Sequence, residues 1–109
     1  MRTTCVKIKL KPNSLDKVEE WSKTLNERRE EVIETLVNET VLFESSFLDV
    51  ISEDEAYLIG VMVIDDIEKC KNVVKHSTKS IDKYHKNFKK ETWGEMKTLK
   101  TLGSFSTKF

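Results

Sequence analysis

Hydrophobic residues are most concentrated in residues 58–64, a run with no polar side chain in which Gly60 is the one position that is not hydrophobic. A strand with one face in solvent should alternate apolar and polar residues. This run does not alternate, so we expect both of its faces to be buried. Residues 41–50 form a second strand-like run, and the short acidic segment 51–55 joins the two into a predicted hairpin.

A strand and a long helix are predicted before this hairpin. Residues 4–11 alternate between apolar and lysine side chains, as in a half-buried strand, and Pro12 ends the pattern. Asn13 or Ser14 then caps a helix that we expect to continue to about Asn38, the best candidate for a left-handed cap. Its apolar positions recur at intervals of three, four or seven residues: Leu15, Val18, Trp21, Leu25, Val32 and Leu36.

Two helical segments and a last strand are predicted after the hairpin. Asp65 and Asp66 cap a helix with a buried stripe at Ile67, Cys70 and Val73 or Val74. A further helical segment begins near residues 77–80. Its apolar side chains are Ile81, Tyr84 and Phe88, with Trp93 at its far end. The last strand is expected from about Met96, with Leu99 and Leu102 as its apolar residues.

The element order is therefore β-α-β-β-α-(α)-β, which predicts one α+β domain over residues 1–109 with a ferredoxin-like fold. Right-handed β-α-β crossovers place both main helices on one face of a four-stranded antiparallel sheet. The expected core packs helical side chains on strand residues 6, 8 and 10: Val18, Trp21, Leu25, Ile67, Cys70 and Val73. The opposite face is left bare, and a second copy of the chain that lays its own sheet across this face would cover it in a homodimer.

Charge and cysteine content narrow the possible partners. The net charge is zero, but acidic side chains dominate residues 12–68 and basic ones residues 69–109. Six lysines make a basic run that suits either a solvated face balanced by the acidic helix or an acidic partner: Lys71, Lys75, Lys79, Lys83, Lys86 and Lys90. The absence of nucleic-acid motifs and the low arginine content argue against nucleic acid. No apolar run is long enough for a membrane span, and two distant cysteines indicate a cytoplasmic protein with reduced thiols.

Residues 76–93 carry the most suggestive chemistry. Asp82 and His85 are three apart and share a helix face, so the carboxylate could orient the imidazole for acid–base catalysis. The same spacing also suits a capping aspartate beside a solvated histidine, or two ligands of a metal. We treat His85, Asp82 and His76 as candidate catalytic residues. We expect no metal, because a DxxH pair on a surface helix is common by chance, and no cofactor, because no nucleotide-binding or P-loop motif is present.

Glu44 interrupts an otherwise apolar strand and would need a partner if both faces were buried. Lys7 or Lys9 of the first strand is the expected partner. The carboxylate could serve a ligand site with a raised pKa, or it could form a structural ion pair at a dimer interface. We group Glu44 with three aromatic residues as candidate ligand contacts: Tyr57, Tyr84 and Trp93.

Three stretches carry a family resemblance: KIKLKPNSLDKVEEW, FESSFL and SIDKYHKNFKKETW. Together they resemble a group of small bacterial proteins catalogued only as a domain of unknown function, which looks like a branch of the dimeric α+β barrel superfamily. That superfamily includes cofactor-free monooxygenases and haem-degrading enzymes. The haem-degrading pattern of a first-strand Asn and a third-strand Trp is absent here, so the resemblance implies the fold without that activity.

Two functions from different classes are therefore expected. The first is a cytoplasmic homodimer with a small-molecule pocket, either a binding module or an enzyme that needs no cofactor. The second is a non-enzymatic interaction protein whose basic C-terminal region binds an acidic partner.

Overall fold

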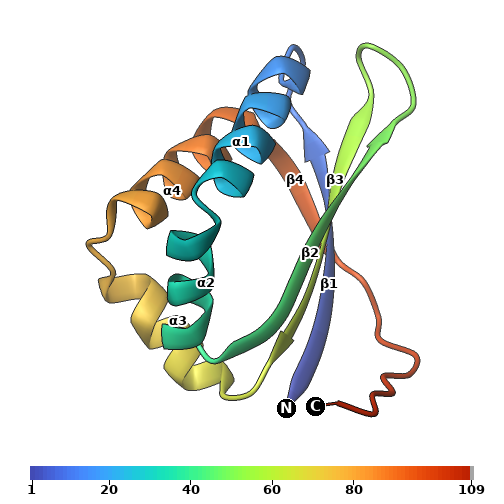
Figure 1. Cartoon of the computed structure of the whole chain (residues 1–109). Coiled ribbons are helices and arrows are strands. Elements are labelled where there is room, and N and C mark those ends of the chain that lie inside the picture. Colours follow the sequence, from blue (N-terminus) through green and yellow to red (C-terminus); the bar gives the residue numbers. More distant parts are fainter. Residues whose placement is uncertain (109) are drawn as a thin grey trace.

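Four antiparallel strands form one sheet, and helices cover one of its two faces (Figure 1). The computed structural model describes residues 1–108. The strands lie in the order β2-β3-β1-β4, which confirms the predicted ferredoxin-like arrangement. Their bounds are β1 Arg2–Leu10, β2 Val41–Val50, β3 Ala56–Ile64 and β4 Trp93–Thr98.

The register decides which side chains face the helices. Glu44 of β2 lies opposite Met62 of β3, and both line the space under the helices. Lys7 of β1 lies opposite Ile59 and one position out of phase with Val6 and Ile8, so it points to the other face. There its ammonium lies 4.4 Å from the centroid of the Tyr57 ring. The predicted pairing of Glu44 with Lys7 or Lys9 is therefore wrong, because the sheet separates these groups.

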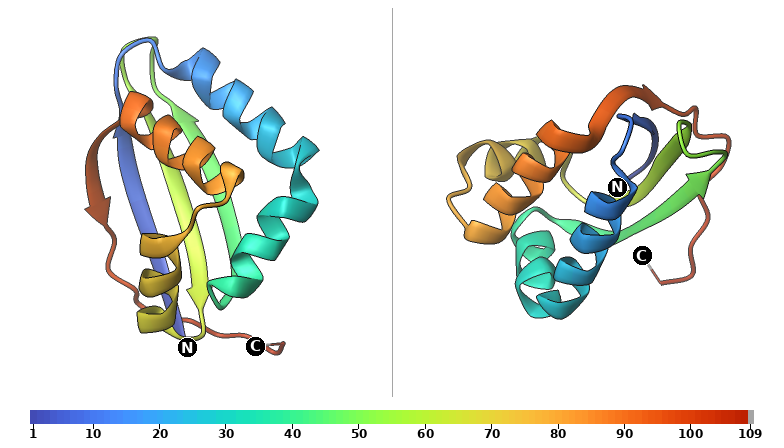
Figure 2. Two further views of the ribbon diagram at one scale, coloured as in Figure 1. Left: turned by 90° about the vertical axis from the view of Figure 1, so that its left-hand side faces the viewer. Right: turned by 90° about the horizontal axis from the view of Figure 1, so that it is seen from above.

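The long first helix is broken into two parts. Helix α1 spans Leu15–Glu27 and helix α2 spans Arg29–Asn38, whereas one continuous helix was expected. The backbone of Arg28 leaves the helical region, with φ −102° and ψ 32°. The break falls inside the polar run 26–31, where no apolar side chain holds the helix against the sheet. Helix α2 consequently changes direction, as Figure 2 shows.

Helix α2 ends in an unusual turn. Glu39 is its C-cap, and Thr40 rather than Asn38 takes the left-handed conformation, with φ 59°. This conformation is uncommon for a β-branched residue. The surrounding contacts hold it, because the Thr40 hydroxyl donates to the Asp66 carbonyl at 3.1 Å and accepts from the Asp66 N–H at 3.0 Å. The turn before β2 is thereby tied to the turn after β3.

Two further helices complete the covering layer: α3 Ile67–His76 and α4 Ser80–Thr92. The predicted cap of α3 is confirmed, since the Asp66 carboxylate accepts from the Lys69 N–H at 3.1 Å. Within residues 1–108 no helix is long and apolar enough to cross a bilayer.

The core consists of two apolar clusters instead of the single one predicted. The larger joins α1 and α4 to the sheet: Ile8, Leu10, Val18, Trp21, Ala56, Leu58 and Phe88. The smaller cluster joins α3 to the first residue of β2 and the last residue of β3. It consists of Val41, Ile64 and Cys70, with Ile67 and Leu36 packed against it. Cys70 is buried as expected, but it and Ile67 pack on β2 and β3 instead of β1.

The C-terminal segment also differs from the expectation. Strand β4 begins at Trp93, directly after α4, so Trp93 belongs to the sheet and not to the preceding helix. Pairing with β1 ends just beyond the strand, where the Leu99 N–H donates to the Cys5 carbonyl at 2.8 Å. Leu102, expected in the strand, is 91% exposed in a tail that passes along the side of the sheet opposite the helices (Figure 1).

We expect Trp21→Ala to destabilise the protein by about 3–5 kcal/mol, because it empties the centre of the larger cluster. Trp21 is buried, and its ring stacks on Phe88 at a centroid distance of 4.5 Å. Urea denaturation of the parent and the variant measures the loss. Val37→Ala on the exposed side of α2 is the matched control and should cost much less than 1 kcal/mol. Equal midpoints for the parent and Trp21→Ala would contradict the packing described here.

Candidate functional site

A cavity of about 240 Å³ lies between the sheet and the helices, where the two apolar clusters fail to meet. Both clusters contribute to its wall, through side chains such as Trp21 and Leu58 from the larger and Leu36 and Cys70 from the smaller. The wall is mostly apolar. Six acidic, basic or imidazole side chains also line it: Glu39, Glu44, Asp82, His85, Lys86 and Lys89.

Gly60 leaves part of the cavity floor without a side chain. It lies in the middle of β3, between Val6 of β1 and Ser46 of β2, and all three residues line the cavity. A Cβ atom added at Gly60 would meet only the Val6 Cγ2 atom, at an ordinary contact distance of 3.5 Å. The space above Gly60 therefore belongs to the cavity. No close approach of neighbouring atoms requires a glycine at this position.

His85 faces the cavity from α4 and is held by Trp21 of α1. The Trp21 Nε1–H donates to His85 Nδ1 at 3.1 Å, and the two rings stack with centroids 5.7 Å apart. Because an indole N–H is only a donor, Nδ1 must be unprotonated and the neutral ring carries its proton on Nε2. Burial, reinforced by the Lys89 charge, lowers the pKa of His85 to about 4. The imidazole is therefore neutral at pH 7.

Asp82 does not orient His85 as the spacing suggested. Both residues line the cavity from the same face of α4, but the Asp82 carboxylate accepts its hydrogen bond from the Ser77 hydroxyl. The ring of His85 is oriented by Trp21 instead. Asp82 acts on the imidazole only through its charge, which is the weakest of the influences on the pKa of His85.

Two glutamates converge from the other side of the cavity. Glu39 stands at the end of α2, in the turn fixed by Thr40, and Glu44 projects from β2. Burial raises the pKa of Glu39 to about 7, and the charges of Asp82 and Glu44 act in the same direction. Burial also raises the pKa of Glu44. The Glu44 side chain has exposed surface, yet many protein atoms lie around its carboxylate, and this burial is what raises its pKa.

Lys89 faces these carboxylates from α4. Its ammonium lies 4.8 Å from the centroid of the Trp93 ring, at the junction of α4 and β4. Burial lowers the pKa of Lys89, while the charges of Glu44 and Glu39 favour the ammonium. Among the described residues, Lys89 forms no ion pair with either glutamate. The opposite charges thus face one another across the cavity without touching.

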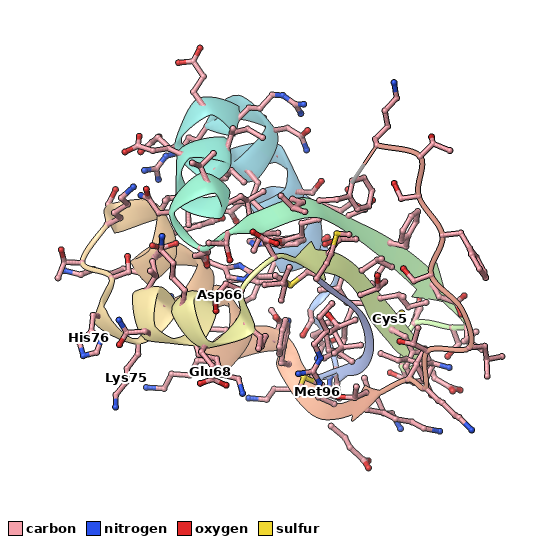
Figure 3. The ribbon with its side chains drawn as sticks, turned by 90° about the horizontal axis from the view of Figure 1, so that it is seen from below. Cys5, Asp66, Glu68, Lys75, His76 and Met96 are labelled. Carbon is pink, nitrogen blue, oxygen red and sulfur yellow. The ribbon has the colours of Figure 1, made fainter. Side chains whose placement is uncertain are left out.

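The structure brings together five of the predicted site residues and separates the others. Asp82, His85, Glu44 and Trp93 line the cavity, and Tyr84 packs against the larger cluster beside it. Tyr57 is on the other face of the sheet, where its hydroxyl donates to Glu55 at 2.7 Å. His76 is exposed at the end of α3 and points outward (Figure 3), with its Nδ1 atom 2.9 Å from the Asn72 carbonyl. Neither residue can reach a ligand in the cavity.

The sequence-based interpretation missed Glu39, Lys89 and Trp21 as site residues. Glu39 looked like an ordinary charge at the end of a helix, and Lys89 like one member of a basic run. The spacing of 82, 85 and 89 does follow one helix face, and it could have identified Lys89 as a neighbour of the two predicted residues. No local pattern could have indicated that Glu39 would face them, because that depends on the break at Arg28 and the turn at Thr40.

No group of three His, Cys, Asp or Glu side chains in residues 1–108 is arranged to hold an ion.

Comparison with protein families gives one match. The model of a family described as "Family of unknown function (DUF6176)" matches residues 1–107. The chain belongs to this family. No curated protein and no solved structure was found to be similar to it. The matched residues include the sheet, the helices and the cavity, and the description of the family names no activity or ligand.

Three groups that line the cavity of this DUF6176 protein differ in their chemical capacity. With a pKa of about 7, the Glu39 carboxyl can accept or donate a proton near neutral pH. Neutral His85 can donate a hydrogen bond through Nε2. Lys89 offers a positive charge to an anionic group.

We expect Glu39→Gln to stabilise the protein at pH 8 and to have little effect at pH 4. An unfolded glutamate ionises near its usual value, whereas folded Glu39 resists ionisation up to a pKa of about 7, so wild-type stability falls as pH rises between these values. Removing the charge relieves this cost, by about 1–2 kcal/mol once partial solvent exposure is allowed for. Urea denaturation across this pH range measures the effect.

The matched control is Glu30→Gln on the exposed surface of α2. Its effect should not grow between pH 4 and pH 8. If Glu39→Gln and Glu30→Gln show the same pH dependence, then Glu39 is not held in the cavity as described.

Proposed function

We propose that this protein binds a small molecule in the cavity between its sheet and its helices. The observation that supports the proposal is the combination of a largely apolar wall with the convergent polar groups of Glu39, Glu44, His85 and Lys89. Small-molecule sites have this composition, and a cavity of about 240 Å³ suits a ligand smaller than a typical drug. The available proton-transfer groups need no cofactor, so catalysis on the bound molecule is compatible with the site.

The basic C-terminal region supports the alternative function less well. Several of its lysines are already engaged with the rest of the chain. Lys79 forms an ion pair with Glu34 of α2 at 3.0 Å, Lys86 donates to the Val74 carbonyl at 3.1 Å, and Lys89 faces the cavity. An acidic partner of Lys79 would have to compete with Glu34 of α2.

We further propose that the free face of the sheet is covered by a second copy of the chain. The register places an apolar stripe there, with Phe43 opposite Val63 and Phe47 opposite Ile59. Phe43 and Phe47 are 45% and 57% exposed, which is costly for large aromatic side chains in a monomer. The same face carries Lys9 on β1 opposite Tyr57 of β3, itself opposite Asp49 on β2. A two-fold partner can therefore match basic and acidic positions while hiding both apolar stripes.

Thermal unfolding against a metabolite library tests the binding function. We expect at least one compact metabolite to raise the unfolding temperature, and heparin to give no salt-sensitive stabilisation at two salt concentrations.

Gly60→Leu should abolish the stabilisation by the metabolite, because the leucine side chain fills the cavity floor, while the variant unfolds no more easily than the parent. Val61→Leu, on the same strand but the opposite face, is the matched control and should keep the ligand effect. A ligand effect that survives Gly60→Leu would place binding elsewhere.

Light scattering coupled to gel filtration tests the dimer. We expect the wild type to elute with twice its chain mass at micromolar concentration, and Val61→Asp to give monomer or aggregate because it places a charge in the apolar stripe. Met62 is the wrong position for this test, since it lines the cavity. A stable, monodisperse wild-type monomer would rule out the proposed assembly without affecting the cavity.

A further inference from the structure

The glutamates and the lysine that face the open part of the cavity come from different elements. Glu39 and Glu44 approach from α2 and β2, and Lys89 approaches from α4 with the Trp93 ring beside its ammonium. The other two charged groups of the lining are already engaged: the Asp82 carboxylate accepts from the Ser77 hydroxyl, and Lys86 donates to the Val74 carbonyl. Glu39, Glu44 and Lys89 are thus left facing the open space.

Protein atoms partly surround Glu39, Glu44 and Lys89, and none of the three has an ion-pair partner among the described residues. Charged groups removed from bulk water are normally paired, because the loss of hydration must be offset by a partner. Here burial acts against the charged form of all three groups, raising the pKa of both glutamates and lowering that of Lys89. They do not form an ion pair with one another in the described chain. A ligand that placed a cation beside the glutamates and an anion beside Lys89 would satisfy both sides at once.

The rest of the wall decides what the ligand carries besides its two charges. This part of the wall includes Val6 and Ile8 of β1, Leu58 of β3, Trp21 of α1 and Ile81 of α4. A hydrophilic skeleton would lose its hydration there without gaining hydrogen bonds. An apolar or aromatic side group of modest size fits both the wall and the volume of about 240 Å³.

We propose that the ligand is an apolar zwitterion, with a primary ammonium at Glu39 and Glu44, a carboxylate at Lys89 and a hydrophobic side group against the apolar wall. Hydrophobic α-amino acids and their close derivatives are the simplest molecules of this class. The proposal rests on the function proposed above, since it concerns the same cavity. His85, through its Nε2–H, is a second donor available to the carboxylate.

Ligands of other classes would leave at least one charged group of the site without an oppositely charged partner, or would bring a like charge close to it. A simple amine would satisfy the glutamates and leave Lys89 facing an apolar group. A simple carboxylate would satisfy Lys89 but leave both glutamates without a cation. A phosphate would bring a double negative charge close to Glu39 and Glu44, which repel it.

Isothermal titration calorimetry with three matched probes tests the proposal. The probes are L-phenylalanine, phenethylamine, which lacks the carboxylate, and 3-phenylpropionate, which lacks the ammonium. At pH 8 Glu39 is ionised, since its pKa is about 7. We expect L-phenylalanine to bind at least tenfold more tightly than either of the other probes. Equal or tighter binding of phenethylamine or 3-phenylpropionate would overturn the zwitterion.

Two variants assign the ends of the ligand. Lys89→Met should reduce the preference for L-phenylalanine over phenethylamine to less than threefold, because the carboxylate has lost its partner. Glu44→Gln should reduce the preference for L-phenylalanine over 3-phenylpropionate. Lys90→Met, which removes the neighbouring exposed lysine, is the control and should change neither ratio. A loss in Lys90→Met equal to that in Lys89→Met would show a general charge effect and overturn the assignment.

The outcomes for the ligand class and for the cavity are distinguishable. If the three phenyl probes fail to bind, but uncharged metabolites stabilise the wild type and not Gly60→Leu, the zwitterion is wrong and the cavity function stands. If no probe and no metabolite stabilises the wild type, both proposals fail. Binding of L-phenylalanine that persists in Gly60→Leu would place the zwitterion outside this cavity and also overturn the proposal.

Discussion

The break between α1 and α2 is the constraint on which the rest of the site depends. A continuous helix would have kept its apolar residues over one line of the sheet and closed the core. Because the backbone leaves the helical region at Arg28, Trp21 packs in the larger cluster while Leu36 packs against the smaller one. The space between the clusters is the cavity. The polar run around Arg28 therefore does more than expose charge to solvent, since it divides the hydrophobic core.

The residues that face this space are fixed by interactions on their own elements. Trp21 sets the ring of His85, and the hydroxyl of Thr40 ties the turn that carries Glu39 to the start of α3. The left-handed conformation of Thr40 costs stability, and so does the burial of the Glu39 carboxyl, whose pKa rises to about 7. Proteins generally retain such costs where a site requires them. Both features are consistent with a cavity maintained for binding.

Periodicity predicted most of the fold and about half of the candidate site. Alternation in β1 and the uniform run in β3 gave the strands, and the crossover rule placed the helices on one face, because these patterns are local and the rule is general. The side of the sheet to which Glu44 points depended on a register that the sequence does not contain. Lys89 and His85 share a helix face and were within reach of local reasoning. Glu39 was not, since only tertiary structure brings the end of α2 to α4.

A crystal structure of the ligand-free protein at neutral pH would test the central claim most directly, which is that the fold holds opposite charges apart across an open cavity. The account predicts that the Lys89 ammonium stays beside the Trp93 ring, that Glu39 and Glu44 face it without contact, and that the space above Gly60 is filled by solvent or by a small molecule retained from the cell. A direct ion pair between Lys89 and Glu44, with helices α2 and α4 packed over a core that contains no cavity, would contradict it.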